Sequence, residues 1–368
     1  MNSIRALTYL IILLFATSCV SNNDPYYKMK KAFKNKDYSS LFEQTKERAE
    51  AGDSEFQVLL GSMYIEGKGT PVNYKKSAEW LLIGIENNGL NSNIAIADKV
   101  EYNLGWMYLS GNGVDKDYKE ALKWLTSSAD KGYAKAYHNL GFMYDKGYGV
   151  RKDKTRAFEF YLYAANKGIV ESQAEVGERY RTGVGVSRNY YQAVRWHKKG
   201  AKGGDRTSQN NLGVMYFEGR GVDKDYIEAV KWYKKSANSG YDVGQYSLGA
   251  MYAHGLGVPQ NYDTAEYWFT KSAEQNNPHA QQDLGIIYAT HRKDYYKAAK
   301  WFKKAANQGK AKSQYNLAVF YNNGQGVSKD SKKVKYWAKK ALNNNDKSVA
   351  KEAKSLLKEH QKWHEKIF

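Results

Sequence analysis

Apolar residues recur at helical spacing through most of the chain, in short segments separated by polar or glycine-containing turns. In one pair of segments, Leu212 and Tyr216 share a stripe of a first helix, because residues four apart lie on the same helix face. Ala229 and Ala237 likewise share a stripe of a second helix. Because the apolar residues of each segment gather on one side, the pattern predicts pairs of amphipathic helices that pack against each other.

The two helices of each pair are separated by residues typical of helix ends. Gly219 and Gly221 interrupt the first helix of the same example and permit a tight turn with positive φ. The second helix then begins after Asp225, and every pair has Asp or Asn at this position. Such side chains cap free backbone N–H groups at a helix start. The predicted N-cap residues are Asn73, Asp117, Asp153, Asn189, Asp225, Asn261, Asp294 and Asp330.

The paired pattern repeats at a nearly constant interval. A Leu-Gly-x-x-Tyr-like pentad recurs with its glycine at Gly61, Gly105, Gly141, Gly177, Gly213, Gly249 and Gly285, and with Ala318 in the eighth copy. The successive gaps are 44, 36, 36, 36, 36, 36 and 33 residues. Such a period predicts a helical-hairpin solenoid, in which each repeat contacts only its neighbours, rather than one globular core.

The recurring glycine and a recurring methionine both point to packing. Glycine in mid-helix is about 1 kcal/mol less favourable than alanine, so we expect close approach of the paired helix as compensation. The expected contact is the large ring of the second helix, namely Trp80, Trp124, Phe160, Trp196, Trp232, Trp268, Trp301 or Trp337. One position of the first helix holds Met63, Met107, Met143, Met215 and Met251. Methionines can form adaptable binding surfaces, but a fixed position in a repeat favours a core role.

The complete pattern, AxxxLGxxYxxGxGVxxDxxxAxxWxxxAAxxG, resembles the Sel1-like repeat, a relative of the tetratricopeptide repeat. The resemblance implies an all-α fold, a right-handed superhelical solenoid of about eight antiparallel helix pairs with terminal capping helices. Three departures are local: the first repeat carries extra residues at 87–98, the seventh has 289–292 in place of a Gly-x-Gly turn, and the eighth has Ala318 for glycine.

Five segments follow from these patterns. They are a signal peptide at 1–18, an anchor and linker at 19–37, an N-terminal capping half-repeat at 38–52, an array of eight repeats at 53–345, and a C-terminal capping helix at 346–368.

The N-terminal segment has the features of an export signal. Arg5 precedes an apolar run at 6–16 that is short for a membrane span, and small residues follow it. Cys19 is the only cysteine, so an intrachain disulfide is impossible. Ala16-Thr17-Ser18-Cys19 resembles a bacterial lipobox, which implies lipid on Cys19; the alternative is ordinary cleavage with an incidental thiol. The residue after the cysteine is Val20 and not an aspartate, which resembles the pattern of lipoproteins that are sorted to the outer membrane. We therefore expect a lipid-anchored protein of the cell envelope, at the outer membrane and facing the periplasm.

Positive charge is concentrated in the C-terminal half. The chain carries +19 overall, but residues 19–185 hold 24 Lys+Arg against 22 Asp+Glu, whereas residues 186–368 hold 32 against 16. A predicted basic ridge on the second helices comprises Lys198, Lys199, Lys234, Lys235, Lys271, Lys303, Lys304, Lys339 and Lys340. The ridge is either a solvated face or a site for anionic lipid headgroups, lipopolysaccharide or an acidic protein surface. For an exported protein these partners fit better than nucleic acid.

The first helices offer a second candidate surface, on the inner face of the solenoid. Its candidate binding residues are Tyr102, Asn103, His138, Asn139, Asn210, Asn211, Tyr246, Gln282, Tyr315 and Asn316. Aromatic rings and amides are suited to binding an extended peptide. Part of the Asn column is shared with the usual repeat pattern, so a structural role is the alternative.

Catalytic patterns are few and isolated. Ser128, Ser348 and Ser355 each precede a lysine by three residues, the spacing of a lysine-activated serine, but the accompanying motifs of such enzymes are absent from the sequence. His360 and His364 lie four apart, with no further metal ligand nearby in sequence. We expect no cofactor, no metal and no catalytic residue.

The sequence therefore favours a non-enzymatic protein–protein interaction scaffold or adaptor of the bacterial cell envelope, whose partner is another envelope or secreted protein. One alternative is an immunity or inhibitor protein that neutralises a secreted toxic effector. The resemblance implies this alternative because some Sel1-like envelope proteins resemble such neutralisers. A less favoured alternative is an enzyme acting on cell-wall or β-lactam substrates.

Overall fold

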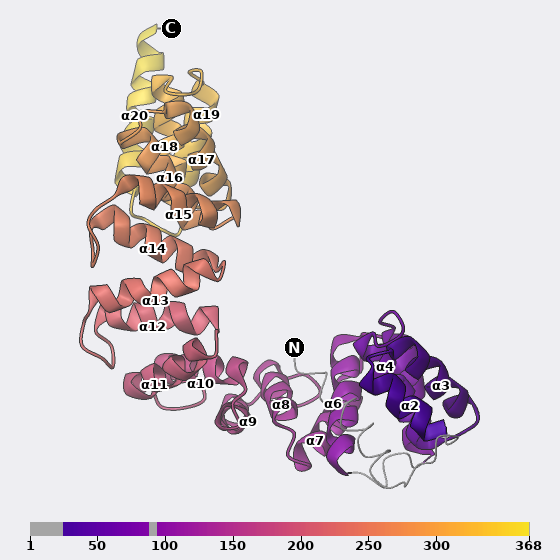
Figure 1. Ribbon diagram of the computed structural model, residues 1–368. Helices are drawn as coiled ribbons and strands as arrows, with labels where there is room; N and C mark the ends of the chain where they lie inside the picture. The colour runs from indigo at the N-terminus through magenta and orange to yellow at the C-terminus, as the bar shows by residue number, and fades with distance from the viewer. Residues whose placement is uncertain (1–24, 88–93, 368) are drawn as a thin grey trace. The chain divides into compact units, whose positions relative to one another are not determined.

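The computed structural model describes residues 25–87 and 94–367, and within these residues every regular element is an α-helix. The chain divides into two compact units, Met1–Arg188 and Asn189–Phe368 (Figure 1). The expected all-α solenoid of paired helices is confirmed. Cys19 and the predicted signal peptide lie outside the described residues.

The first unit contains helices α2 to α10. Their bounds are α2 (Pro25–Lys34), α3 (Tyr38–Glu50), α4 (Ser54–Glu66), α5 (Tyr74–Glu86), α6 (Ile94–Ser110), α7 (Tyr118–Asp130), α8 (Ala134–Lys146), α9 (Lys154–Asn166) and α10 (Val170–Thr182). Helix α3 falls within the predicted capping half-repeat, whereas α2 lies in the segment 19–37, where the sequence pattern predicts no helix. Helix α6 has 17 residues where most helices have 13, so part of the extra sequence lengthens it.

The second unit contains helices α11 to α20. Their bounds are α11 (Tyr190–Lys202), α12 (Arg206–Glu218), α13 (Tyr226–Asn238), α14 (Asp242–His254), α15 (Tyr262–Glu274), α16 (Pro278–Thr290), α17 (Tyr295–Asn307), α18 (Ala311–Asn323), α19 (Ser331–Leu342) and α20 (Ala350–Ile367). Helices α12 to α19 follow one another as successive layers in chain order (Figure 1). Helix α20 packs against α19 at the C-terminal end of this unit.

The predicted helix ends are confirmed. The side chain of Asp225 accepts a hydrogen bond of 2.9 Å from the backbone N–H of Glu228, and all eight predicted N-cap residues accept such a bond. Gly219 ends α12 in the left-handed conformation, with φ of 71°. In the seventh repeat, which lacks the Gly-x-Gly turn, Lys293 adopts a positive φ of 56° instead.

The expected contact over the Leu-Gly glycine is wrong by one residue. A Cβ built on Gly249 would lie 2.7 Å from Cδ1 of Phe269, which follows Trp268 in sequence. In each copy for which this contact is resolved, the facing side chain is likewise the residue after the predicted ring: Leu81, Leu125, Tyr161, Tyr233, Phe269 and Phe302. The tryptophans are displaced by one position, and most are only half-buried on the flank of the second helix. The close approach was expected correctly, but the ring was not.

The methionine position belongs to the core, as expected. Met63, Met107, Met143, Met215 and Met251 are each at most 2% exposed. The fourth repeat has Arg179 at this position, and Arg179 is also buried, at 5% exposure. A charged side chain therefore occupies a place in the first unit that is apolar in the other repeats.

A column of glutamines joins successive repeats. In the second unit, Gln245 donates to the carbonyl oxygen of Ala237 at 3.3 Å, and its own oxygen accepts from Gln275 at 2.8 Å. Gln57, Gln173, Gln209, Gln281 and Gln314 make the same bond to an alanine carbonyl of the preceding helix. Each such glutamine adds a side-chain donor to a carbonyl oxygen at the end of a helix, which also accepts a backbone N–H bond from the following turn, as Ala237 does from Gly240.

First and second helices have different surroundings. A first helix contacts the first helix of the next repeat, as α12 does α14 and α16 does α18, so the first helices line the inner side of each unit. The second helices present their lysines outward. Among the described residues, no helix combines the length and apolar character needed to span a membrane.

Candidate interaction surfaces

Lysines and exposed apolar side chains share the outer face of the second helices in the second unit. The face is defined by the nine lysines Lys198, Lys199, Lys234, Lys235, Lys271, Lys303, Lys304, Lys339 and Lys340, together with Tyr191, Ile227, Tyr267, Tyr296 and Tyr336. All belong to α11, α13, α15, α17 or α19. We refer to these residues as the basic–aromatic face. The lysines of this face were predicted from the sequence, but its exposed tyrosines were not.

The two lysines of a pair have different environments. The second lysine stacks on the tryptophan three residues earlier: the ammonium of Lys199 lies 4.0 Å from the ring centre of Trp196, and that of Lys235 lies 4.2 Å from Trp232. Lys304 makes the same contact with Trp301 at 4.3 Å. This cation–π contact holds the ammonium against the helix. These tryptophans, of which Trp196 is buried and Trp232 and Trp301 are half-buried, thus organise the basic face in addition to packing the repeat.

None of the nine lysines has a carboxylate within 4.0 Å among the described side chains. Two of the three acidic residues of α15 are engaged elsewhere, and the third, Glu274, is exposed. Glu266 accepts from Arg292 at 2.8 Å and from the hydroxyl of Tyr288 at 2.7 Å. Asp263 also pairs with Arg292. The positive charge of this face is therefore not neutralised by the protein itself.

A polar cluster lies on the inner side of the second unit. The hydroxyl of Tyr246 on α14 donates to Asp283 on α16 at 3.2 Å. The ring of His279 lies 5.6 Å from that of Tyr246, and the ammonium of Lys310 lies 3.2 Å from Nδ1 of His279. Burial raises the pKa of Asp283, and burial together with Lys310 lowers the pKa of His279. Of these residues only Tyr246 was predicted; Asp283 was detectable because it replaces Asn in the repeat.

The other predicted inner-face residues of the second unit lie on the first helices α12, α16 and α18. Gln282 is on α16, and Tyr315 and Asn316 are on α18; all three are half-buried. Asn211 is half-buried on α12, but Asn210 is only 5% exposed, and its side-chain oxygen accepts from Ser247 at 3.2 Å. Asn210 is thus engaged in contacts between neighbouring first helices.

The first unit carries the remaining predicted inner-face residues on α6 and α8. Tyr102 packs edge-on against Tyr133, with ring centres 5.0 Å apart, and Asn103 beside it is half-buried. Nδ1 of His138 lies 2.8 Å from the hydroxyl of Ser172, and burial lowers the pKa of His138. Asn139 follows His138 and is also half-buried.

A buried ionic cluster accompanies Arg179 in the first unit. Asp145 pairs with Arg179 and, at 2.8 Å, with Lys154. Burial acts to raise the pKa of Asp145, but the bonds from Lys154 and Arg179 outweigh it and lower that pKa below its ordinary value. Arg179 also lies 4.9 Å from the ring centre of Tyr161. This cluster was not predicted, although in the sequence Arg179 replaces the methionine of the other repeats.

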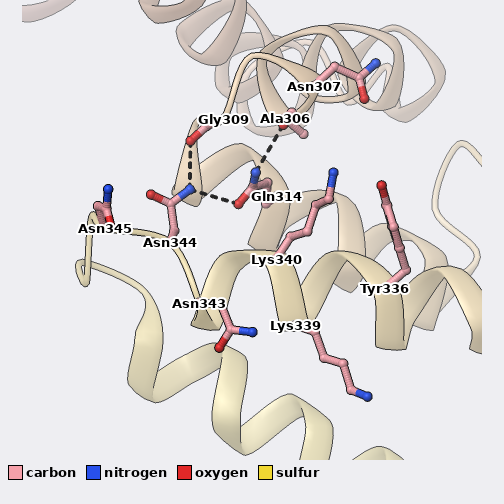
Figure 2. Close-up of a pocket in the computed structure, with 10 residues that line it drawn as sticks. All are labelled: Ala306, Asn307, Gly309, Gln314, Tyr336, Lys339, Lys340, Asn343, Asn344 and Asn345. Carbon is pink, nitrogen blue, oxygen red and sulfur yellow. Dashed lines mark hydrogen bonds between the residues drawn. The ribbon is translucent and has the colours of Figure 1, made fainter.

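An open polar pocket lies at the C-terminal end of the basic–aromatic face (Figure 2). Asn344 donates to the carbonyl oxygen of Gly309 at 2.8 Å and to the side chain of Gln314 at 3.1 Å. Figure 2 shows Lys340 and Tyr336 side by side on α19, with Lys339 extending in another direction. The ammonium of Lys340 lies 4.8 Å from the ring centre of Tyr336. The pocket thus joins the glutamine column to the basic–aromatic face.

The repeat geometry agrees with comparison to known families. The sequence profile of the Sel1 repeat matches eight successive segments: 54–88, 99–133, 134–169, 170–205, 207–241, 243–277, 278–310 and 311–346. The chain belongs to the Sel1 repeat family. Each segment from 54–88 to 311–346 covers all or most of one first and one second helix, from α4–α5 to α18–α19. Sel1 repeat proteins in general mediate interactions between proteins. No protein of curated function matches the chain.

Two solved structures resemble this Sel1 repeat protein over most of its length. The protein c5321 of uropathogenic Escherichia coli, described as a protective antigen with an SLR fold, is 36% identical with a TM-score of 0.72. The alignment covers 84% of this chain and 65% of c5321, so the chain spans just under two thirds of that protein. A Sel1 repeat protein of Oxalobacter formigenes is 28% identical with a TM-score of 0.63, covering 92% and 95% of the two chains.

An immunity protein of Pseudomonas aeruginosa, Pa5087, aligns less well. It is 18% identical with a TM-score of 0.39, and the alignment covers 57% of this chain and 81% of Pa5087. A likeness at this level carries no information about the function of this Sel1 repeat protein.

In this Sel1 repeat protein, the serines that precede a lysine by three residues have other hydrogen-bond partners. Ser128 is fully buried and donates to the carbonyl oxygen of Asp98. Lys131 instead bonds Glu101 at 2.8 Å, and Ser355 donates to Glu359 at 3.1 Å. The amide of Ser348 donates to Asp346.

The paired histidines at the C-terminus give no metal site that can be described. His360 is buried, whereas the side chain of His364 lies outside the described residues. Within the described part of the chain, no three potential ligands gather into a metal-binding group. Proteins built on the Sel1 repeat are typically scaffolds rather than catalysts.

Proposed function

We propose that this Sel1 repeat protein is a non-enzymatic scaffold of the bacterial cell envelope, which binds another protein through the inner face of its second unit. The observation that carries this proposal is the polar cluster of Tyr246, His279, Asp283 and Lys310. Residues from neighbouring first helices are held by their mutual contacts while remaining partly exposed. Such ordering lowers the entropy lost on binding, which favours a specific partner.

The chemistry of this face suits an extended peptide segment. Tyr246 and Tyr315 present aromatic surface at low conformational cost, and Gln282 and Asn316 offer amide donors and acceptors. Asp283 adds a carboxylate whose raised pKa reflects its burial. A partner that donates hydrogen bonds to the Asp283 carboxylate would use the acceptor capacity that the bond from Tyr246 leaves.

Site-specific photo-crosslinking tests the scaffold proposal. A photoreactive residue replaces Gln282 or Tyr315 on the inner face, or Lys300 on the outer face as the matched control, in cells that express the full chain. We expect one protein of the same mass to be captured from both inner positions and not from Lys300, and capture from Tyr315 to fall after Tyr246→Ala. Equal capture from all three positions, or none from the inner pair, would contradict the proposal.

Anchoring at the envelope is a separate part of the proposal. The lipobox-like sequence before Cys19 supports it. Metabolic labelling with a fatty acid analogue should label the wild-type chain and not Cys19→Ala, and the labelled protein should fractionate with the outer membrane. An unlabelled wild-type chain would rule out the lipid anchor without affecting the binding proposal.

A further inference from the structure

The basic–aromatic face combines unpaired cations with exposed apolar side chains, a combination that neither solubility nor packing requires. We propose that this face binds the surface of a phospholipid bilayer that carries anionic headgroups. The inference concerns lipid rather than a protein partner, so it goes beyond the scaffold function and does not depend on it.

The basic–aromatic face carries an excess of positive charge. Residues 186–368 hold twice as many basic as acidic residues, and the nine lysines of the face have no carboxylate within 4.0 Å among the described side chains. Of the three carboxylates of α15, Asp263 and Glu266 are paired with Arg292, and only Glu274 remains near Lys271. Each unpaired lysine near an anionic leaflet adds attraction that accumulates over the face.

The lysines of the face are also regularly arranged. Each of α11, α13, α17 and α19 contributes one lysine pair, and the stacking of repeats places these pairs at successive layers. In α11, α13 and α17 the second lysine lies 4.0–4.3 Å from a tryptophan ring centre, so its position is restrained. A regular array of cations on an open surface matches many mobile headgroups better than it matches one compact acidic ligand.

The exposed apolar side chains distinguish lipid from other polyanions. Tyr191 and Tyr296 are 70% and 71% exposed, and tyrosine, with an apolar ring and a polar tip, favours the headgroup level of a bilayer. Ile227, at the equivalent position of α13, is 60% exposed. An aliphatic side chain gains from contact with acyl chains but has no ring that could stack on a nucleobase. This position therefore favours a lipid surface over nucleic acid.

Vesicle binding tests the inference directly. The full chain with Cys19→Ala, which removes any acyl group, is sedimented with vesicles of phosphatidylcholine alone or mixed with phosphatidylglycerol. The comparison variants are Lys198→Gln/Lys234→Gln/Lys303→Gln/Lys339→Gln on the face and Lys224→Gln/Lys312→Gln/Lys329→Gln/Lys347→Gln outside it. The four control lysines are exposed and belong to the same unit, and their substitution removes the same amount of charge as the face variant. Circular dichroism verifies that each variant keeps its helix content.

We expect binding to the anionic vesicles above the phosphatidylcholine background. The face variant should lower the partition coefficient by about 100-fold and the control variant by less than about threefold. Tyr191→Ser/Ile227→Ser/Tyr296→Ser should also weaken vesicle binding while leaving any retention on double-stranded DNA unchanged. Equal losses for the two lysine variants, no binding to anionic vesicles, or tighter retention on DNA than on vesicles at the same ionic strength would each overturn the inference.

Discussion

At the scale of single residues, the repeated glycine is explained by the side chain that faces it. Gly249 faces Phe269, which is 2% exposed and packs against the backbone where a Cβ would stand. The eighth repeat has Ala318 instead, and the residue at the facing position is Ala338. Both are fully buried. The glycine and the large side chain therefore vary together, because the space between the paired helices is shared between them.

This shared space gives a prediction for a double-mutant cycle. Gly249→Ala should destabilise the α14–α15 pair by about 1–3 kcal/mol, because its Cβ would overlap Phe269. Phe269→Ala should cost about 3–5 kcal/mol through the cavity it leaves. In the Phe269→Ala background, Gly249→Ala should instead stabilise by up to about 1 kcal/mol, because the overlap is gone and alanine favours the helix. That combination reproduces Ala318 with Ala338. Amide hydrogen exchange of α14 and α15 measures each step. Equal penalties for Gly249→Ala in the two backgrounds would refute the shared-space explanation.

Glu66 gives a second prediction at this scale, for pH. Burial raises the pKa of Glu66 to about 7, although Lys68 opposes the shift, and Oε2 of Glu66 lacks a hydrogen-bond partner among the described residues. Since the folded state favours the protonated form, this site is most stable below the unfolded pKa of about 4.5. Its stability then falls as the pH rises through about 7.

Glu66→Gln should remove this dependence, because an amide has no proton to lose. We expect the substitution to stabilise α4 by about 1 kcal/mol at a pH above 7, with the value reduced for partial exposure, and to have little effect near pH 5. Hydrogen exchange of α4 measures both conditions, and Glu55→Gln on the same helix is the control. The same effect of Glu66→Gln at both pH values would show that Glu66 does not titrate as expected.

At the scale of helices, the glutamine column determines how one repeat is joined to the next. Gln245 links the end of α13 to the residue that follows α15. In the second repeat an ion pair replaces the bond between two amide side chains. Glu101 occupies the position equivalent to Gln245 and accepts from Lys131 at 2.8 Å. Both pairs are 30 residues apart. The two solutions should therefore be interchangeable.

The exchange can be tested with two substitutions. Gln245→Glu alone should destabilise the joint of α13, α14 and α15 by about 1–3 kcal/mol, because a buried carboxylate would face the Ala237 carbonyl without a donor. Adding Gln275→Lys should recover more than half of this loss. The control is the double variant Lys271→Gln/Gln245→Glu, which changes the charge on the neighbouring turn of α15 without placing a lysine at position 275. No recovery with Gln275→Lys would mean that the glutamine column depends on its bond to the alanine carbonyl alone.

The helix pairs and their ends were predictable from the sequence because they depend on local patterns. Asp225 caps a helix and Gly219 ends one through backbone geometry that adjacent residues determine. The ring that faces the glycine was assigned one residue away, because Trp232 and Tyr233 differ by only a 100° turn of the helix and both are aromatic. The cluster of Tyr246 and Asp283 joins side chains 37 residues apart, so only the stacking of repeats brings it together.

At the scale of the whole molecule, charge is distributed unevenly between the two units. Residues 19–185 are nearly balanced, and the first unit places opposite charges in contact, as Lys131 with Glu101 and Lys154 with Asp145. Residues 186–368 carry a net charge of +16, with the nine lysines of the basic–aromatic face unpaired. Like charges on one face repel one another and oppose the folded state.

Salt should therefore stabilise the second unit but not the first. Raising the concentration of NaCl from about 0.02 M to about 0.5 M shortens the screening length from roughly 20 Å to about 4 Å. We expect α13 and α17 to gain about 1 kcal/mol in opening free energy as lysine repulsion is screened, whereas α7 and α9 should change little or lose stability as their ion pairs weaken. Hydrogen exchange of the full chain follows both units in one sample. Lys198→Gln/Lys234→Gln/Lys303→Gln/Lys339→Gln should reduce the gain markedly, because it removes four of the nine repelling charges. An equal gain in both units, or one that persists in this variant, would show that salt acts on hydration in general rather than on the basic–aromatic face.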